Sequence, residues 1–176
     1  MREYKKIMCI DVEATCWPDR SKGRLNDIIE IGIQQVDIES KELVGEAVSI
    51  LVFPTQSEIS EFCTNLTTIT PEMVEMAMDF PDAIKFFVDT LHPEKCIFAS
   101  WGAYDKNQFE RQCKREGVSY PFTTHLNVKE LFAATYGYTG ALDEMAEEVG
   151  LTFEGTHHRG MDDARMVARI LLKLLK

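Results

Sequence analysis

The fold is decided by Lys5-Lys6-Ile7-Met8-Cys9-Ile10-Asp11-Val12-Glu13, a mostly apolar run that ends in two carboxylates. In an extended strand, residues two positions apart point to the same face of the sheet. Asp11 and Glu13 are therefore expected side by side, with Val12 turned into the core. Two like charges held together at the end of a strand are costly unless a cation or a proton compensates them. The pair predicts a central strand with a site of chemistry at its end.

The size and composition are those of one compact domain. The chain has 176 residues, of which 45% are hydrophobic and 27% are charged, as in ordinary globular proteins. No stretch approaches the roughly 20 apolar residues that a bilayer span needs. The N-terminus leads straight into the strand, which is unlike a signal peptide. We expect a single domain over residues 1–176 and no membrane partner.

The cysteine spacing and the net charge bear on the cellular location of the protein and on its possible partners. The five cysteines are scattered and contain no C-x-x-C pair, which favours neither a disulfide framework nor a zinc site and fits a reducing, cytoplasmic location. The net charge of −10 argues against broad electrostatic adhesion to nucleic acid or to an anionic membrane. A short nucleic-acid strand bound through metal ions remains compatible with it.

The rest of the pattern predicts an α/β layer fold. Strands are expected at 5–13, 28–36, 47–52 and 96–101, with a hairpin turn at 37–41 and an exposed loop at 19–26. Helices are expected at 71–78, 80–91, 104–116, 128–136, 142–149 and 161–176. A strand meander followed by alternating strands and helices implies a mixed central sheet flanked by helices. In such sheets, sites lie at strand ends where the connections open.

The last helix carries an apolar stripe at helical spacing, formed by Ala164, Val167, Ile170, Leu171 and Leu174. Extending this stripe back by one turn reaches Asp163, which should therefore face the core. An acid in the first turn is also favoured by the helix dipole, but a buried carboxylate needs a partner, which favours function. Asp162 continues instead into Arg165, and we expect it on a solvated, ion-paired face.

Asp105 follows the predicted strand at 96–101 and begins the next helix. An acid in this position is often only a helix cap. Trp101 and Tyr104 beside it offer stacking surface, although partly buried core aromatics explain them as well.

Two of the four histidines stand close to Asp163 in the sequence. His157 and His158 lie in the loop before the last helix, where a histidine near carboxylates can accept a proton from water near neutral pH. His158 has the shorter reach to the helix start, but spacing alone leaves His157 open. His92 and His125 are expected on the surface.

The combination has a physical logic. Four acidic side chains suit hard divalent ions such as Mg²⁺ or Mn²⁺. Two such ions about 4 Å apart can clamp a phosphodiester, activate an attacking water and stabilise the leaving oxygen. The order D-x-E, then D, then H-x-x-x-x-D therefore predicts metal-dependent phosphodiester hydrolysis.

Three motifs resemble those of the DnaQ-like DEDDh 3′→5′ exonucleases, across nearly the whole chain: Asp11-Val12-Glu13-Ala14-Thr15, Trp101-Gly102-Ala103-Tyr104-Asp105 and His158-Arg159-Gly160-Met161-Asp162-Asp163-Ala164. The chain is most similar to the Eri-type (3′hExo-like) branch. That similarity rests on Glu13-Ala14-Thr15-Cys16, Phe62-Cys63, Leu66-Thr67-Thr68-Ile69-Thr70 and the run from His158 to Asp163.

The resemblance implies a ribonuclease H-like fold and one DEDDh exonuclease domain. It also implies release of nucleoside monophosphates from single-stranded 3′ ends with two Mg²⁺ or Mn²⁺ ions, on RNA somewhat more than on DNA. By position, the metal ligands would be Asp11, Glu13, Asp105 and Asp163, and the general base His158. Substrate contacts would come from Ala14, Thr15, Leu66, Thr67, Trp101 and Tyr104. Some Eri-type proteins carry an additional nucleic-acid-binding domain, for which we expect no room here.

Two other functions fit the same pattern. A catalytically silent nucleic-acid-binding domain is expected to lose one of the acids, and all four acids are present. A hydrolase of small phosphodiesters or short oligonucleotides is favoured by the acidic balance, because a long polyanion would be repelled.

Overall fold

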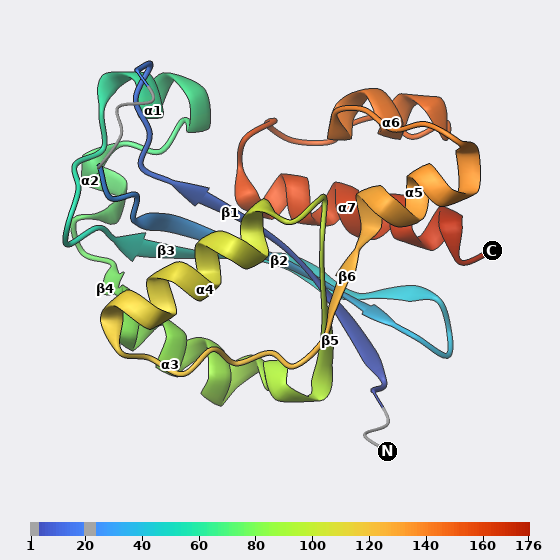
Figure 1. Cartoon of the computed structure of the whole chain (residues 1–176), viewed down its shortest axis with the longest axis horizontal. Coiled ribbons are helices and arrows are strands. Elements are labelled where there is room, and N and C mark those ends of the chain that lie inside the picture. Colours follow the sequence, from blue (N-terminus) through green and yellow to red (C-terminus); the bar gives the residue numbers. More distant parts are fainter. Residues whose placement is uncertain (1–3, 20–23) are drawn as a thin grey trace.

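The computed structural model describes residues 4–19 and 24–176, so part of the loop predicted at 19–26 lies outside the described residues. A six-stranded mixed sheet in the order β4-β3-β2-β1-β5-β6 forms the centre. Figure 1 shows α3 and α4 on one side of this sheet and α5, α6 and α7 on the other. The predicted mixed sheet flanked by helices is confirmed.

Three long strands form the antiparallel meander, and shorter parallel strands extend the sheet at both edges. The strands are β1 (Lys6–Ala14), β2 (Ile28–Asp37), β3 (Glu42–Phe53), β4 (Met78–Asp79), β5 (Cys96–Ser100) and β6 (His125–Asn127). β5 pairs with β1 in parallel only from Lys6 to Cys9. Beyond that point the edge of β1 is open, and this opening matters for the site.

The helices are α1 (Glu61–Thr67), α2 (Pro71–Val74), α3 (Phe80–Leu91), α4 (Tyr104–Glu116), α5 (Val128–Tyr136), α6 (Leu142–Glu148) and α7 (Gly160–Leu174), with a 3₁₀ turn η1 (Pro93–Lys95). The helix predicted at 71–78 is wrong in its second half. α2 ends at Val74, and Met78 pairs with Val52 of β3 instead. Among the described helices, none combines the length and apolarity of a bilayer span.

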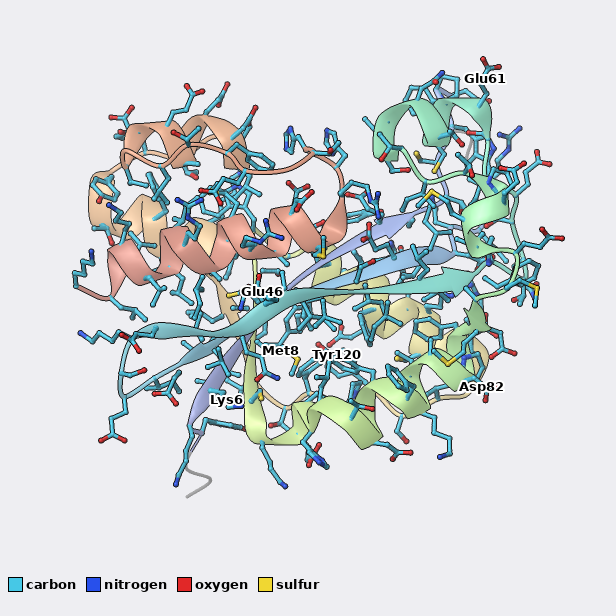
Figure 2. All side chains as sticks on the ribbon, turned by 180° about the vertical axis from the view of Figure 1, so that it is seen from behind. Lys6, Met8, Glu46, Glu61, Asp82 and Tyr120 are labelled. Carbon is cyan, nitrogen blue, oxygen red and sulfur yellow. The ribbon has the colours of Figure 1, made fainter. Side chains whose placement is uncertain are left out.

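The strict alternation of β1 separates two cores. Met8, Ile10 and Val12 join the cluster under α3 and α4, whereas Ile7 and Cys9 join the cluster under α5, α6 and α7. Met8 and Tyr120, both labelled in Figure 2, belong to the α3/α4 side. Asp11 and Glu13 continue the odd-numbered series, so they lie on the face that α7 covers.

Candidate active site

Two acids from β1 and one from α7 meet at the end of the central strand. Carboxylate oxygens of Asp11, Glu13 and Asp163 all lie within 4.8 Å of one another. Glu13 is 9% and Asp163 3% exposed. The predicted burial of Asp163 is confirmed, and segments 150 residues apart in the sequence bring three of the four predicted acids together.

Asp105 joins this group from the N-terminal turn of α4. Its Oδ1 accepts a hydrogen bond of 3.0 Å from the backbone N–H of Val12, the residue between Asp11 and Glu13. This N–H is free because β5 pairs with β1 only as far as Cys9. The side chain therefore takes the place of a missing ladder partner, which explains why an acid at this helix start is buried.

α7 can approach the acids closely because two glycines meet beneath it. Gly32 lies opposite Asp11 in the β1–β2 register, and a Cβ at Gly32 would come within 1.8 Å of the carbonyl carbon of Gly160. A Cβ at Gly160 would come within 2.9 Å of the Asp11 carbonyl oxygen. Only a pair of glycines admits this contact, which brings the first turn of α7 onto the end of β1.

A second polar contact holds the same turn. Glu30 of β2 is fully buried and accepts hydrogen bonds from the Gly160 N–H at 2.9 Å and the Ser49 hydroxyl at 2.6 Å. Arg159 adds a two-pronged ion pair to the same carboxylate, at 3.2 and 3.4 Å. Glu30 and Arg159 were not among the predicted site residues. The available signal was a single acid within the isoleucine-rich run at 28–33.

The crowded acids resist ionisation when no cation is present. Burial, then Asp105, Glu13 and Asp163, raise the pKa of Asp11 well above its ordinary value. Burial and the neighbouring carboxylates raise the pKa of Glu13 to about 9 and that of Asp163 to about 7. For Asp105, burial raises the pKa to about 6 against the opposing Val12 hydrogen bond.

This electrostatic strain predicts a pH-dependent response to metal. In the metal-free folded protein, the pKa of Asp163 is about 7 and that of Glu13 is about 9. In the unfolded chain the same acids lose their protons at about pH 4. The metal-free fold therefore loses stability as the pH rises through the folded pKa values. Mg²⁺ or Mn²⁺ should raise the unfolding midpoint more at about pH 8 than at about pH 5.5, because protons compete with metal. Thermal melts with and without metal at both pH values check this; equal shifts at the two values would contradict it.

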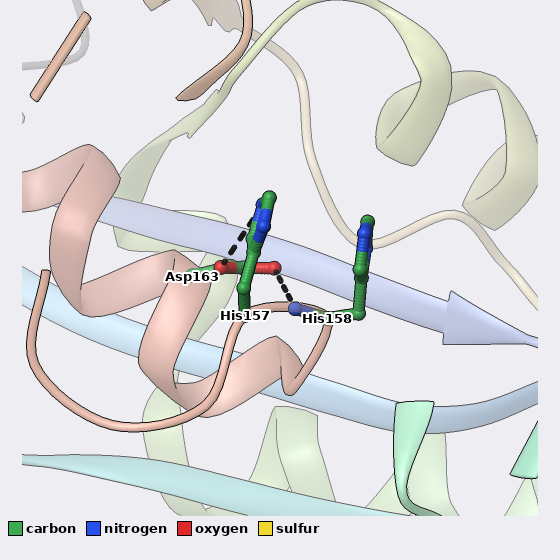
Figure 3. Close-up of side chains that lie close together, drawn as sticks. All are labelled: His157, His158 and Asp163. Carbon is green, nitrogen blue, oxygen red and sulfur yellow. Dashed lines mark hydrogen bonds and ion pairs between the residues drawn. The ribbon is translucent and has the colours of Figure 1, made fainter. Parts of the chain in front are cut away.

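His158 precedes this centre in a left-handed conformation, with φ +64°. Its backbone N–H donates to Asp163 Oδ2 at 3.0 Å (Figure 3). Burial, then the neighbouring His157, lower the pKa of its imidazole below the usual value. The neutral ring that a general base requires is therefore favoured.

His157 also reaches the centre. Its ring stacks on that of His158 at 4.2 Å, and its Nε2 lies 4.0 Å from Asp163 Oδ1. Proximity alone therefore does not choose between the two histidines.

Two expectations about neighbouring side chains are wrong. Asp162 is 9% exposed, not solvated, because the loop before α7 folds back and the Thr156 N–H donates to its Oδ2 at 2.9 Å. Its predicted pairing with Arg165 is present at 3.4 Å. His125 is half-buried on β6, where it bonds the Ser100 hydroxyl at 2.9 Å. His92 is exposed, as expected.

Three of the six predicted substrate contacts are exposed or partly exposed, and the other three are buried. Leu66 and Tyr104 are 38% and 55% exposed and present free surface. Trp101 is partly buried and packs edge-on against Phe132 at 5.8 Å.

The other three are buried, and the hydroxyl groups of the two threonines among them are already paired. Ala14 is buried. The Thr15 hydroxyl accepts from the Asp27 N–H at 2.9 Å and bonds Ser57 at 2.7 Å. The Thr67 hydroxyl donates to the Cys63 carbonyl at 2.9 Å.

The donor set fits hard divalent cations. Carboxylate oxygens are the ligands that Mg²⁺ and Mn²⁺ prefer. Burial and mutual repulsion raise the pKa values of Glu13 and Asp163, and a cation would relieve the same repulsion. Asp163 Oδ1 is buried and accepts no hydrogen bond from any described residue. A bound cation would compensate both the charge and the unpaired oxygen.

Comparisons with known proteins found relatives both in sequence and in fold. Residues 8–171 match the model of the exonuclease family RNase T. Rat (Rattus norvegicus) 3′-5′ exoribonuclease 1 is 28% identical over 98% of the chain, which spans 54% of that relative's length. The Bacillus subtilis (strain 168) protein named probable 3′-5′ exonuclease KapD is 31% identical over 97% of the chain and 84% of its own length. A solved nuclease domain of 3′hExo, a DEDDh family member bound to rAMP, superposes with a TM-score of 0.89 at 26% identity, covering 98% of this chain and 92% of that one. The predicted ribonuclease H-like fold is confirmed.

Proposed function

The chain belongs to the exonuclease family RNase T, and we propose that it is a metal-dependent 3′→5′ exonuclease. It would release nucleoside monophosphates from single-stranded 3′ ends, with RNA favoured over DNA. The observation that carries this proposal is the meeting of Asp11, Glu13 and Asp163 within 4.8 Å, beside a histidine loop. We propose that residues 1–176 form one such domain. The chain spans about half the length of the rat relative. The activity and substrates of that relative are therefore only proposals for this chain.

The metal ligands in this proposal are Asp11, Glu13, Asp105 and Asp163, which would hold two Mg²⁺ or Mn²⁺ ions. When bound, such ions supply positive charge to the phosphodiester and make the attacking water more acidic. Glu30 and Arg159 hold α7 against the sheet, so Asp163 keeps its place opposite Asp11. The residues are thus fixed before substrate arrives, which favours the transition state.

His158 is the proposed general base. Its lowered pKa keeps the imidazole neutral near pH ~7, so it can accept the proton of the attacking water. Water would attack the phosphorus of the terminal phosphodiester, and the bond to the 3′ oxygen of the preceding nucleotide would break. The product is a nucleoside 5′-monophosphate and a strand shortened by one residue.

The substrate end would lie against Leu66 and Tyr104, the two exposed candidates. Ala14, Thr15, Thr67 and Trp101 stay predictions for contacts with the terminal nucleotide. RNA is favoured because the rat relative is named an exoribonuclease and the 3′hExo domain is bound to rAMP. A cytoplasmic location is proposed because all five cysteines are free thiols.

A strand-polarity assay tests this function. Single-stranded RNA and DNA of the same sequence, labelled at the 5′ end, are incubated with Mg²⁺ or Mn²⁺ and resolved by length. We expect stepwise shortening from the 3′ end, faster on RNA, and no cleavage of a circular single strand. Cleavage of the circle would indicate an endonuclease. Digestion restricted to dinucleotides would indicate a small-phosphodiester hydrolase. Binding without cleavage would indicate a silent nucleic-acid-binding domain.

A further inference from the structure

The two histidines before α7 form a second cluster of donor atoms together with Asp163. Nitrogens of His157 and His158 and a carboxylate oxygen of Asp163 all lie within 4.8 Å of one another. The two rings are almost parallel, with an interplanar angle of 14°. In Figure 3 they stand side by side on the loop, with His157 beside the Asp163 carboxylate.

One oxygen of this cluster has no partner. Asp163 is 3% exposed, and its Oδ2 accepts from the His158 N–H. Its Oδ1 accepts no hydrogen bond from a described residue and lies 4.0 Å from His157 Nε2. A buried carboxylate oxygen without a donor is costly, and this one is next to the imidazole edge.

The other ring nitrogen of His157 faces a carboxylate of its own. His157 Nδ1 lies 3.9 Å from Asp143 Oδ2 on α6. Metal-binding histidines commonly donate their second N–H to a carboxylate, which fixes the ring and leaves the opposite nitrogen for the metal. At 3.9 Å the two atoms are beyond hydrogen-bond distance, and a small approach of Asp143 would let its carboxylate hold His157 with Nε2 toward Asp163.

We propose that His157, His158 and Asp163 form a site for Zn²⁺, and that zinc bound there inhibits the enzyme. A set of two imidazoles and one carboxylate binds borderline ions such as Zn²⁺ better than it binds Mg²⁺. Tetrahedral zinc needs ligand atoms about 3.3 Å apart. The ion must also lie in the plane of each imidazole, so one of the two stacked rings has to turn about its side-chain bonds before both nitrogens reach the zinc. Water would take the fourth position. The cysteine spacing gave no sign of zinc because this site uses no cysteine.

Zinc bound at this site is expected to inhibit the enzyme because the two sites share one ligand. Asp163 belongs both to this cluster and to the carboxylate group with Asp11 and Glu13. Zinc would withdraw Asp163 from the ions of the carboxylate group and occupy the lone pair of His158. This consequence rests on the proposed function, whereas zinc binding itself does not.

Direct binding of Zn²⁺ tests the site without any nuclease assay. The metal-free protein competes with a chromogenic chelator for Zn²⁺, and wild type is compared with His157→Asn. We expect one zinc per chain in wild type and affinity roughly tenfold or more weaker in the variant. Asp143→Asn, which leaves all three ligands in place, should also weaken binding. His92→Asn is the matched control, because His92 is exposed and lies outside the cluster.

The same variants separate the site from the proposed function. In the presence of Mg²⁺, His157→Asn should digest single-stranded RNA nearly as fast as wild type and resist inhibition by added Zn²⁺. Equal zinc affinity in wild type and His157→Asn, or no zinc binding by wild type, would overturn the site. Zinc binding as expected without any digestion in Mg²⁺ would instead overturn the proposed function and leave the site standing.

Discussion

Replacing Asp163 by asparagine is expected to reduce Mg²⁺-dependent nucleotide release by about 10³-fold or more, because several kcal/mol of charge stabilisation depends on the metal ligands. Asp163 is 3% exposed, and its carboxylate lies within 4.8 Å of those of Asp11 and Glu13. The asparagine side chain keeps the shape and removes the charge. Initial rates on a labelled RNA strand measure the loss, and Asp11→Asn should behave in the same way.

Asp162→Asn is the matched control on the neighbouring residue. Asp162 accepts from the Thr156 N–H, and the asparagine oxygen can accept the same hydrogen bond. We expect a loss of less than about fivefold, with a modest decrease in stability from the weakened Arg165 pair. Equal losses at Asp162 and Asp163 would contradict the assignment of Asp163 as the metal ligand.

Replacing His158 by alanine is expected to reduce the turnover rate on the order of 10²–10⁴-fold, the usual contribution of a general base. The carboxylates remain in place, so the stabilisation of the fold by Mn²⁺ should survive. In wild type, activity should fall as the pH decreases through the lowered pKa of His158, because the protonated ring cannot accept a proton. The measurement is a rate profile against pH, combined with thermal melts in Mn²⁺.

His157→Ala decides which histidine is the base. Its ring lies beside Asp163, but the proposed mechanism gives it no proton to accept. Its loss should change turnover by only a few-fold. A severe effect at His157 with a mild one at His158 would move the base by one residue.

The positions of three site acids could be predicted from the sequence because they depend on local patterns within one strand and one helix. The alternation of β1 put Asp11 and Glu13 on one face, and the stripe of α7 predicted that Asp163 is buried; both are confirmed. The place of Asp105 after a buried strand left a helix cap as the simpler interpretation, and its assignment as a metal ligand came from the family resemblance.

Other features depend on contacts between distant segments. Asp162 was predicted to be solvated because the helical pattern does not reveal that residues 155–156 fold back over it. β6 has three residues and exists through pairing with β5, so His125 could not be located in advance. The contact of Gly32 with Gly160 requires the β1–β2 register and the docking of α7 together.

The most direct test of the central claim is hydrolysis of single-stranded RNA by the wild-type chain with Mg²⁺ in ¹⁸O-labelled water, followed by mass spectrometry of the products. Water attack at the terminal phosphorus predicts nucleoside 5′-monophosphates that carry one ¹⁸O on the phosphate. Asp163→Asn should release these products at a rate reduced by about 10³-fold or more. Products with 3′-phosphate or cyclic phosphate ends, or 5′-monophosphates without ¹⁸O, would contradict a water-attacking centre built on Asp11, Glu13, Asp105, Asp163 and His158.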